Sequence, residues 1–152
     1  MYRTLDYGQT WESYKTFAAV SRVDKMAVTR IIDLEGQIGF TIYHDEYNVR
    51  FYRSPDYGAS WSYSQIYFTG GGFVTFDNVY LGNGVVLLNV PSTNLDYRGI
   101  YRSINKGANW SQVLNLDATN GFFCNLGNGT VFFIKGTSIR RSTDYGASWS
   151  SF

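Results

Sequence analysis

Two short polar segments carry side chains that are well suited to holding a sugar. They contain His44, Asp45, Glu46 and Tyr47 in one place, and Asp96, Tyr97 and Arg98 in another. Tyrosine rings stack on the apolar faces of sugars, and carboxylates and arginines bind hydroxyl or acid groups. We therefore take these residues as candidates for binding a glycan or a protein partner.

Cleavage of a glycosidic bond makes a further demand on such residues. A retaining glycosidase needs two carboxyl groups roughly 5 Å apart, or in sialidases a tyrosine with a carboxylate partner. Asp24, Glu46 and Tyr47 could be read as acid, partner and nucleophile. Solvated loop charges account for the same residues more simply. We therefore assign no catalytic residue and lean against an enzyme, with a glycoside hydrolase as the alternative.

Composition excludes several other functions. One histidine and one cysteine are too few to build a zinc site, so we expect no metal and no cofactor. A formal net charge of +1 gives no electrostatic reason to expect nucleic acid or an anionic membrane as a partner. No run has the length of a membrane span, and the N-terminus has no signal-peptide pattern. Cys124 lies in an apolar stretch, which predicts a buried free thiol.

An eight-residue segment, repeated four times, dictates how these residues are positioned. The copies are Thr4–Trp11, Ser54–Trp61, Ser103–Trp110 and Ser142–Trp149, with the pattern Ser/Thr, any, Asp/Asn, any, Gly, two more, Trp. The defining residues are Asp6, Gly8, Trp11, Asp56, Gly58, Trp61, Asn105, Gly107, Trp110, Asp144, Gly146 and Trp149. The tryptophans are 50, 49 and 39 residues apart, and periods in this range are typical of propeller blades.

The chemistry of this repeated segment predicts a tight structural turn. The Asp or Asn side chain accepts hydrogen bonds from backbone N–H groups ahead of it, and the Ser or Thr hydroxyl does so more weakly. Glycine supplies the positive φ that the turn needs. The tryptophan then begins a new strand and is expected to carry its indole into a core, so that Trp61→Ala would cost about 3–5 kcal/mol.

The repeated segment resembles the Asp-box, also called the bacterial neuraminidase repeat. This repeat is found in sialidases, in some glucan-hydrolysing enzymes and in sortilin-like receptor domains. The resemblance implies blades of four antiparallel strands, with each box joining the third and fourth strands at the outer rim. The opposite end of the blades would then carry the candidate binding residues, together with Arg22, Asp24 and Asp117.

One further feature of the sialidases does not match. They share three arginines that grip the substrate acid, the first in a Phe/Tyr-Arg-Ile-Pro motif. The segment Thr29-Arg30-Ile31-Ile32 lacks both the aromatic residue and the proline. The resemblance also suggests an extracellular or virion-surface location, which the chain itself leaves unknown.

Alternating and apolar runs between the repeated segments predict an all-β chain. We expect strands at 26–33, 38–43, 49–53, 62–68, 73–81, 85–90, 99–102, 111–115, 122–125, 131–135 and 139–141. Residues 44–48 are expected to form a polar loop, and 82–84 and 127–129 to form hairpin turns with positive φ. The run 85–90 is almost wholly apolar, as expected for a strand covered on both faces.

The chain therefore reads as one domain, 1–152, of about three blades. The approximate units are 12–61, 62–110 and 111–149, with 1–11 as a partial unit, and the last unit is expected to hold three strands and a box. Three blades cannot close a ring, since propellers typically have about four to eight. We expect a homodimer that closes a six-bladed ring, with other oligomers or a piece of a longer propeller as alternatives.

Three functions stay open at this point. The first is a non-catalytic, sialidase-like propeller that self-assembles and binds glycans or proteins through the loops opposite the boxes. The second is a subunit of a sialidase-like or glucan-cleaving hydrolase. The third is a structural or engineered repeat scaffold whose only property is assembly.

Overall fold

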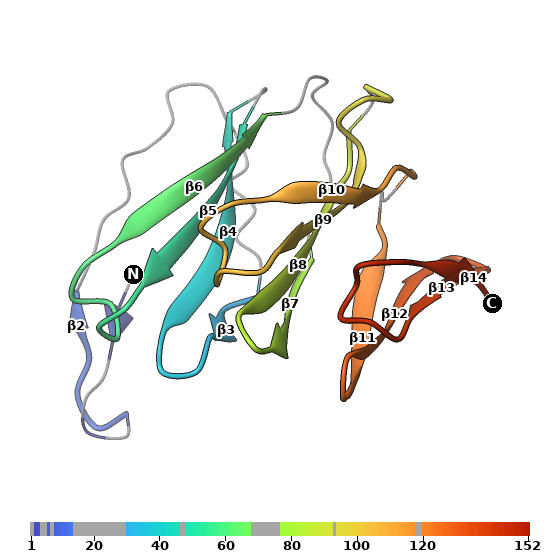
Figure 1. Ribbon diagram of the computed structural model, residues 1–152. Helices are drawn as coiled ribbons and strands as arrows, with labels where there is room; N and C mark the ends of the chain where they lie inside the picture. The colour runs from blue at the N-terminus through green and yellow to red at the C-terminus, as the bar shows by residue number, and fades with distance from the viewer. Residues whose placement is uncertain are drawn as a thin grey trace.

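The computed structural model describes residues 2–3, 6, 8–13, 30–45, 48–67, 77–92, 94–117 and 120–152, of which 2–3 and 42–45 are described by their backbone. Within these ranges every regular element is a β-strand (Figure 1). Three antiparallel sheets of four strands each follow one another along the chain. The described residues contain no helix that is long and apolar enough to cross a membrane.

Each sheet is a simple meander in which consecutive strands are hydrogen-bonded neighbours. The first sheet consists of β3 (Ile32–Asp33), β4 (Ile38–Asp45), β5 (Asn48–Ser54) and β6 (Ser62–Tyr67). The second consists of β7 (Asn78–Gly82), β8 (Val85–Val90), β9 (Gly99–Ser103) and β10 (Ser111–Leu114). The third consists of β11 (Phe122–Gly127), β12 (Thr130–Lys135), β13 (Ser138–Ser142) and β14 (Ser150–Ser151). A separate pair, β1 (Tyr2–Arg3) and β2 (Glu12–Ser13), precedes them.

The sheets stand side by side in chain order, as blades do (Figure 1). The first strands of neighbouring sheets touch, because β3 contacts β7 and β7 contacts β11. The fourth strands, β6, β10 and β14, each form the other edge of their sheet. This arrangement is the one expected for propeller blades, whose first strands surround a common axis.

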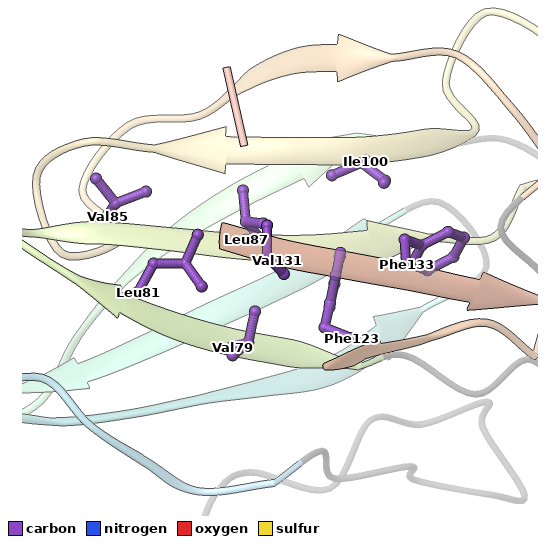
Figure 2. Packing of buried hydrophobic residues seen from close by; sticks show 8 residues of the cluster. All are labelled: Val79, Leu81, Val85, Leu87, Ile100, Phe123, Val131 and Phe133. Carbon is purple, nitrogen blue, oxygen red and sulfur yellow. The ribbon is translucent and has the colours of Figure 1, made fainter. Parts of the chain in front are cut away.

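Apolar side chains fill the spaces between the sheets. Between the second and third sheets, β7, β8 and β9 meet β11 and β12 (Figure 2). The residues of this cluster are Val79, Leu81, Val85, Leu87, Ile100, Phe123, Val131 and Phe133. Two smaller clusters join the first and second sheets. All of β8 is buried, as its apolar sequence predicted, because it has a sheet against each face.

In all four repeated segments a backbone N–H donates to the Asp or Asn side chain four residues before it, and in the last three the glycine N–H also donates to the serine hydroxyl. In the second copy the Ser60 N–H donates to Asp56 Oδ1 (2.6 Å) and the Gly58 N–H to Ser54 Oγ (2.5 Å). Asn105 takes the place of the aspartate in the third copy and accepts from the Asn109 N–H at 2.9 Å. The turns connect β1 to β2, β5 to β6, β9 to β10 and β13 to β14. In each complete sheet they therefore join the third and fourth strands.

Three details differ from the sequence-based expectations. The stretch 44–48 is not a loop throughout, because β4 continues through Asp45 and β5 begins at Asn48. The third sheet is complete, since β14 pairs with β13 after the last repeated segment. Cys124 is only half-buried, because the face of β11 on which it lies has no described sheet packed over it.

The tryptophans are also less buried than expected. Trp61 and Trp110 are half-buried at the edges of their sheets and pack edge-on against Phe40 and Phe51, with ring centroids 5.1 and 5.2 Å apart. Trp11 is 63% exposed. The indoles therefore cover the outer margin of the space between sheets and do not fill its centre.

Candidate functional site

The candidate residues belong to connections between second and third strands, at the end opposite the repeated segments. In the first sheet this connection is the tight hairpin between β4 and β5, where Asp45 pairs with Asn48. Asp45 and His44 end β4, while Glu46 and Tyr47 lie outside the described residues. In the second sheet the connection is the loop between β8 and β9, which carries Asp96, Tyr97 and Arg98.

The structure brings these two connections to the same side of the molecule. Val49 at the start of β5 packs in one cluster with Val90 at the end of β8. The hairpin after β4 and the loop after β8 therefore leave the same end of adjacent sheets. Arg22 and Asp24, which were expected at this end, lie outside the described residues.

The loop of residues 94–98 is held in place by hydrogen bonds from its neighbours. The Asp96 N–H donates to Asn94 Oδ1 (2.9 Å), and the buried Tyr101 hydroxyl donates to the Tyr97 carbonyl (3.0 Å). Asn115 Nδ2 donates to the Leu95 carbonyl (2.7 Å). A loop fixed in this way loses little conformational entropy when it binds a ligand.

Arg98 has an unused hydrogen-bond donor. Its Nε is buried, and no described residue accepts a hydrogen bond from it. Buried donors are almost always paired, so an unpaired one calls for an explanation. Asp96 and Tyr97, which precede it, are exposed. The loop thus offers a cation, a carboxylate and an aromatic ring to an incoming molecule.

Other described charged groups near this end are paired with groups of the protein itself. Asp117 forms an ion pair with Lys135 at 2.5 Å. Asp77, at the start of β7, accepts from the Phe123 N–H at 2.8 Å and lies 3.8 Å from Arg30. Among the described residues there is no cluster of His, Cys, Asp and Glu that could hold a metal ion.

A groove of about 520 Å³ lies between the outer margins of the first and second sheets. One wall is β6, and the other is built from the repeated segment and loop of the second sheet; β6 and β10 can be followed in Figure 1. Its lining residues are Ser64, Gln65, Ile66, Tyr67, Tyr97, Tyr101, Ala108, Asn109 and Trp110. We call this feature the inter-sheet groove. Of the candidate residues that the structure describes, Tyr97 alone is in its lining.

The lining of the inter-sheet groove is held in place by hydrogen bonds within the protein. The Trp110 indole N–H donates to Ser64 Oγ (2.8 Å), and that hydroxyl donates to the Gly107 carbonyl (2.6 Å). Gln65 Nε2 donates to Asn48 Oδ1 at 2.7 Å. Burial raises the pKa of the Tyr101 hydroxyl. The floor is therefore internally satisfied, neutral and firmly positioned.

Sequence reasoning missed this groove because its two walls come from different repeat units. Tyr67 belonged to an expected strand, and Trp110 was assigned to the core. A usable signal was present in β6, where Tyr63 and Tyr67 occupy a strand that ends its sheet. Large aromatic residues on an edge strand have no sheet neighbour on one side.

Comparisons with known proteins bear on the fold. No protein-family model matches the sequence, and no curated protein matches it. Among solved structures, the chain is similar to the GH74 xyloglucanase from Xanthomonas campestris, with a TM-score of 0.57 and 20% sequence identity. The chain has a propeller-like fold. The similarity covers 82% of this chain but 23% of that enzyme, a β-propeller glycoside hydrolase, so this chain spans about a quarter of its length.

Proposed function

We propose that this chain is a sialidase-like Asp-box propeller unit that binds glycans or proteins without cleaving them. The position of the repeated segments supports the Asp-box assignment, because each of the last three joins the third and fourth strands of a sheet. The binding surface is formed by the loops at the opposite end, from His44 to Tyr47 and from Asp96 to Arg98.

The unused donor of Arg98 is the observation that carries this proposal. Arg98 is half-buried, and its side chain gains a hydrogen bond when it turns the unpaired Nε–H outward to a ligand oxygen. The neighbouring exposed Tyr97 supplies a ring face, and the fixed loop keeps both in place. A glycan provides hydroxyl and acid oxygens beside apolar ring faces, and so meets both groups. The similarity to a glycoside hydrolase fold is consistent with a carbohydrate ligand.

A glycan array followed by titration calorimetry tests the binding proposal. We expect at least one glycan to bind, and Arg98→Ala to weaken it by about tenfold, since one hydrogen bond to a charged group contributes about 1.5 kcal/mol. Leu95→Ala, at a residue 60% exposed in the same loop but outside the candidate set, separates the arginine from general loop effects. Binding by no glycan and no protein would leave assembly as the only property of the chain.

Hydrolysis is tested separately, with a fluorogenic sialoside and with a reducing-sugar assay on β-glucan. We expect no turnover of either substrate. Turnover that is abolished by Glu46→Gln would establish the hydrolase alternative and overturn the non-catalytic assignment.

We also propose that the chain assembles with a second copy to close a six-bladed ring. The face of the third sheet that points away from the second has no described sheet over it, and it presents Phe122, Phe132 and Ile134. Phe122 is 51% exposed on this face, whereas Phe123, on the opposite face of β11, is buried. The exposed Trp11 offers the complementary surface, because Trp110 packs on the preceding sheet through Phe51. Light scattering would show twice the mass of one 17.3 kDa chain.

A further inference from the structure

We infer that the inter-sheet groove is a second binding site, and that its ligand is a neutral oligosaccharide of pyranose rings. The site lies on the outer margin of the molecule and shares Tyr97, but no other candidate residue that the structure describes, with the loop surface around Arg98. The inference deepens the proposed glycan-binding function, on which it rests, by naming the chemical class that this part of the surface accepts.

The composition of the lining indicates the ligand. Aromatic rings come from both walls: Tyr67 from β6, and Tyr97, Tyr101 and Trp110 from the second sheet. Tyr67 is 67% exposed, so its ring is accessible to a ligand. Aromatic rings on facing walls suit flat apolar surfaces such as those of pyranose rings. A volume of about 520 Å³ accommodates a short oligosaccharide but not a folded partner.

The absence of charge from the lining favours a neutral sugar over an acidic one. None of the described residues of the lining is an arginine, lysine, aspartate or glutamate. Arg50 is the nearest described cation on the neighbouring strand, but it is engaged: its Nε donates to Gln65 Oε1 at 3.2 Å and its guanidinium lies 4.3 Å from the centre of the Tyr63 ring. A carboxylate in the groove would therefore lose water without gaining a charged partner.

The remaining polar groups suit hydroxyl groups. Ser64, Gln65 and the Trp110 indole are already bonded within the protein. The Asn109 side-chain amide and the hydroxyls of Tyr67 and Tyr97 bind no other group among the described residues. Each of these groups can both donate and accept a hydrogen bond, as a sugar hydroxyl can. They lie at the edges of the groove. The hydrogen-bonded groups keep the groove in shape, while the groups at its edges bind the hydroxyl groups of the ligand.

A peptide strand added to the edge of β6 is the competing occupant. Edge strands do pair with peptides through their backbone groups. The groove, however, places the repeated segment of the second sheet across from β6, with Trp110 and Ser64 bonded to each other. A glycan stacked on the rings fits this closed floor better than a strand that needs an open edge.

The test uses cellohexaose and maltohexaose as neutral probes and 3′-sialyllactose as the acidic one, measured by calorimetry on the whole chain. We expect a neutral probe to bind, and Tyr67→Ala and Tyr97→Ala each to weaken it by about tenfold, as expected for loss of one aromatic contact. Tyr57→Ala is the matched control, because Tyr57 is 68% exposed and outside the groove.

The outcomes separate the groove from the proposed function as a whole. If a neutral probe binds and is lost in Arg98→Ala but not in Tyr67→Ala, glycan binding stands and the groove inference is wrong. Binding of sialyllactose alone, or of a β-strand peptide that Tyr67→Ala releases, overturns the inference as well. If no glycan of any kind binds, the groove inference is wrong, and the proposed function stands only if the chain binds a protein partner.

Discussion

At the scale of single residues, the repeated segments show how one carboxylate can organise a turn. In the last copy Ser148 donates to Asp144 through its backbone N–H (2.9 Å) and its hydroxyl (2.5 Å). Burial alone would raise the pKa of Asp144, but the bonds from Ser148 and Ser142 outweigh it and hold that pKa at about 2. The charged form is therefore the one that the folded turn prefers.

The depressed pKa of Asp144 predicts acid sensitivity. The pKa of Asp144 in the folded chain, about 2, lies below its ordinary value of 3.8. This carboxylate therefore contributes stability above pH 3.8 that is lost as the pH falls toward 2. Asp144→Asn should keep the turn, as Asn105 does at the same position. We expect the melting temperature of Asp144→Asn, relative to wild type, to improve between pH 4 and pH 2. The reciprocal variant Asn105→Asp should be more acid-sensitive than wild type. If the melting temperature of Asp144→Asn differs from that of wild type by the same amount at pH 4 and at pH 2, this account is refuted.

The partial burial of the tryptophans changes the expected cost of removing them. A fully buried tryptophan would lose about 3–5 kcal/mol on truncation, and the half-buried Trp61 should lose about 2–3 kcal/mol. Most of that comes from the edge-on contact with Phe40. Trp11→Ala, at the exposed copy, should change the free energy of unfolding by less than about 0.5 kcal/mol. Urea unfolding at low protein concentration measures both, and a loss under about 1 kcal/mol for Trp61→Ala would contradict the packing.

At the scale of elements, the sequence predicted most strands because turn chemistry marks where each begins and ends. The stretch 82–84 was expected to have positive φ, and Gly82, Asn83 and Gly84 have φ values of 91°, 53° and 77°. The boundary at residues 44–48 was wrong because polar residues there suggested a loop. Backbone pairing between β4 and β5 extends as far as Asp45 and Asn48 regardless of side-chain polarity.

The binding surfaces were harder to predict than the strands. Asp96, Tyr97 and Arg98 could be placed at one end because their loop follows a recognisable strand. The inter-sheet groove depends on how Tyr67 of one sheet faces Trp110 of the next. Such a relation is set by packing between sheets, and no local pattern in the sequence encodes it.

Two glycines in the turns allow the stability cost of backbone strain to be measured apart from the cost of crowding between sheets. Gly146 and Gly127 both have positive φ, 77° and 84°. A Cβ on Gly146 would lie 2.6 Å from Leu87 Cδ2 of the neighbouring sheet, whereas one on Gly127 would meet nothing within 4 Å. We expect Gly127→Ala to cost about 1–2 kcal/mol from the left-handed backbone alone. Gly146→Ala should cost about 1–3 kcal/mol more, from overpacking. Equal losses in chemical denaturation would show that the sheets are not closely packed there.

At the scale of the whole molecule, polar contacts from the repeated segments join neighbouring sheets. Arg102, just before the third repeated segment, donates through Nε to the Tyr145 carbonyl of the fourth at 2.8 Å. Lys106 of the third segment forms an ion pair at 3.5 Å with Glu35 of the preceding sheet. A hydrogen bond from the Tyr80 hydroxyl lowers the pKa of Glu35 and keeps it charged for that pair. An interface between two copies could use polar groups of the repeated segments in the same way.

The proposed ring makes a prediction that distinguishes it from other dimers. Phe122→Ser should weaken association by removing apolar area from the uncovered face, and Trp11→Ala should weaken it from the other side of the same interface. Ile104→Ser, at a residue 65% exposed in the turn of the second sheet, is the matched control and should leave the mass unchanged. Concentration-dependent light scattering measures each variant, and a wild-type chain that stays at 17.3 kDa refutes the ring.

Mixing the two weakened variants then reveals the geometry. In a two-chain ring the Phe122 face of each copy meets the Trp11 end of the other, so the ring contains that interface twice. Each variant alone has one change in both interfaces. A mixed ring instead places both changes in one interface and leaves the other entirely wild type. If the changed contacts within one interface are not independent, the double change costs less than the sum of two single ones, and the mixed ring is more stable than the mean of the two variant rings. In a dimer that joins two Phe122 faces, Trp11→Ala would associate as the wild-type chain does, and the mixture would lie between the two variants.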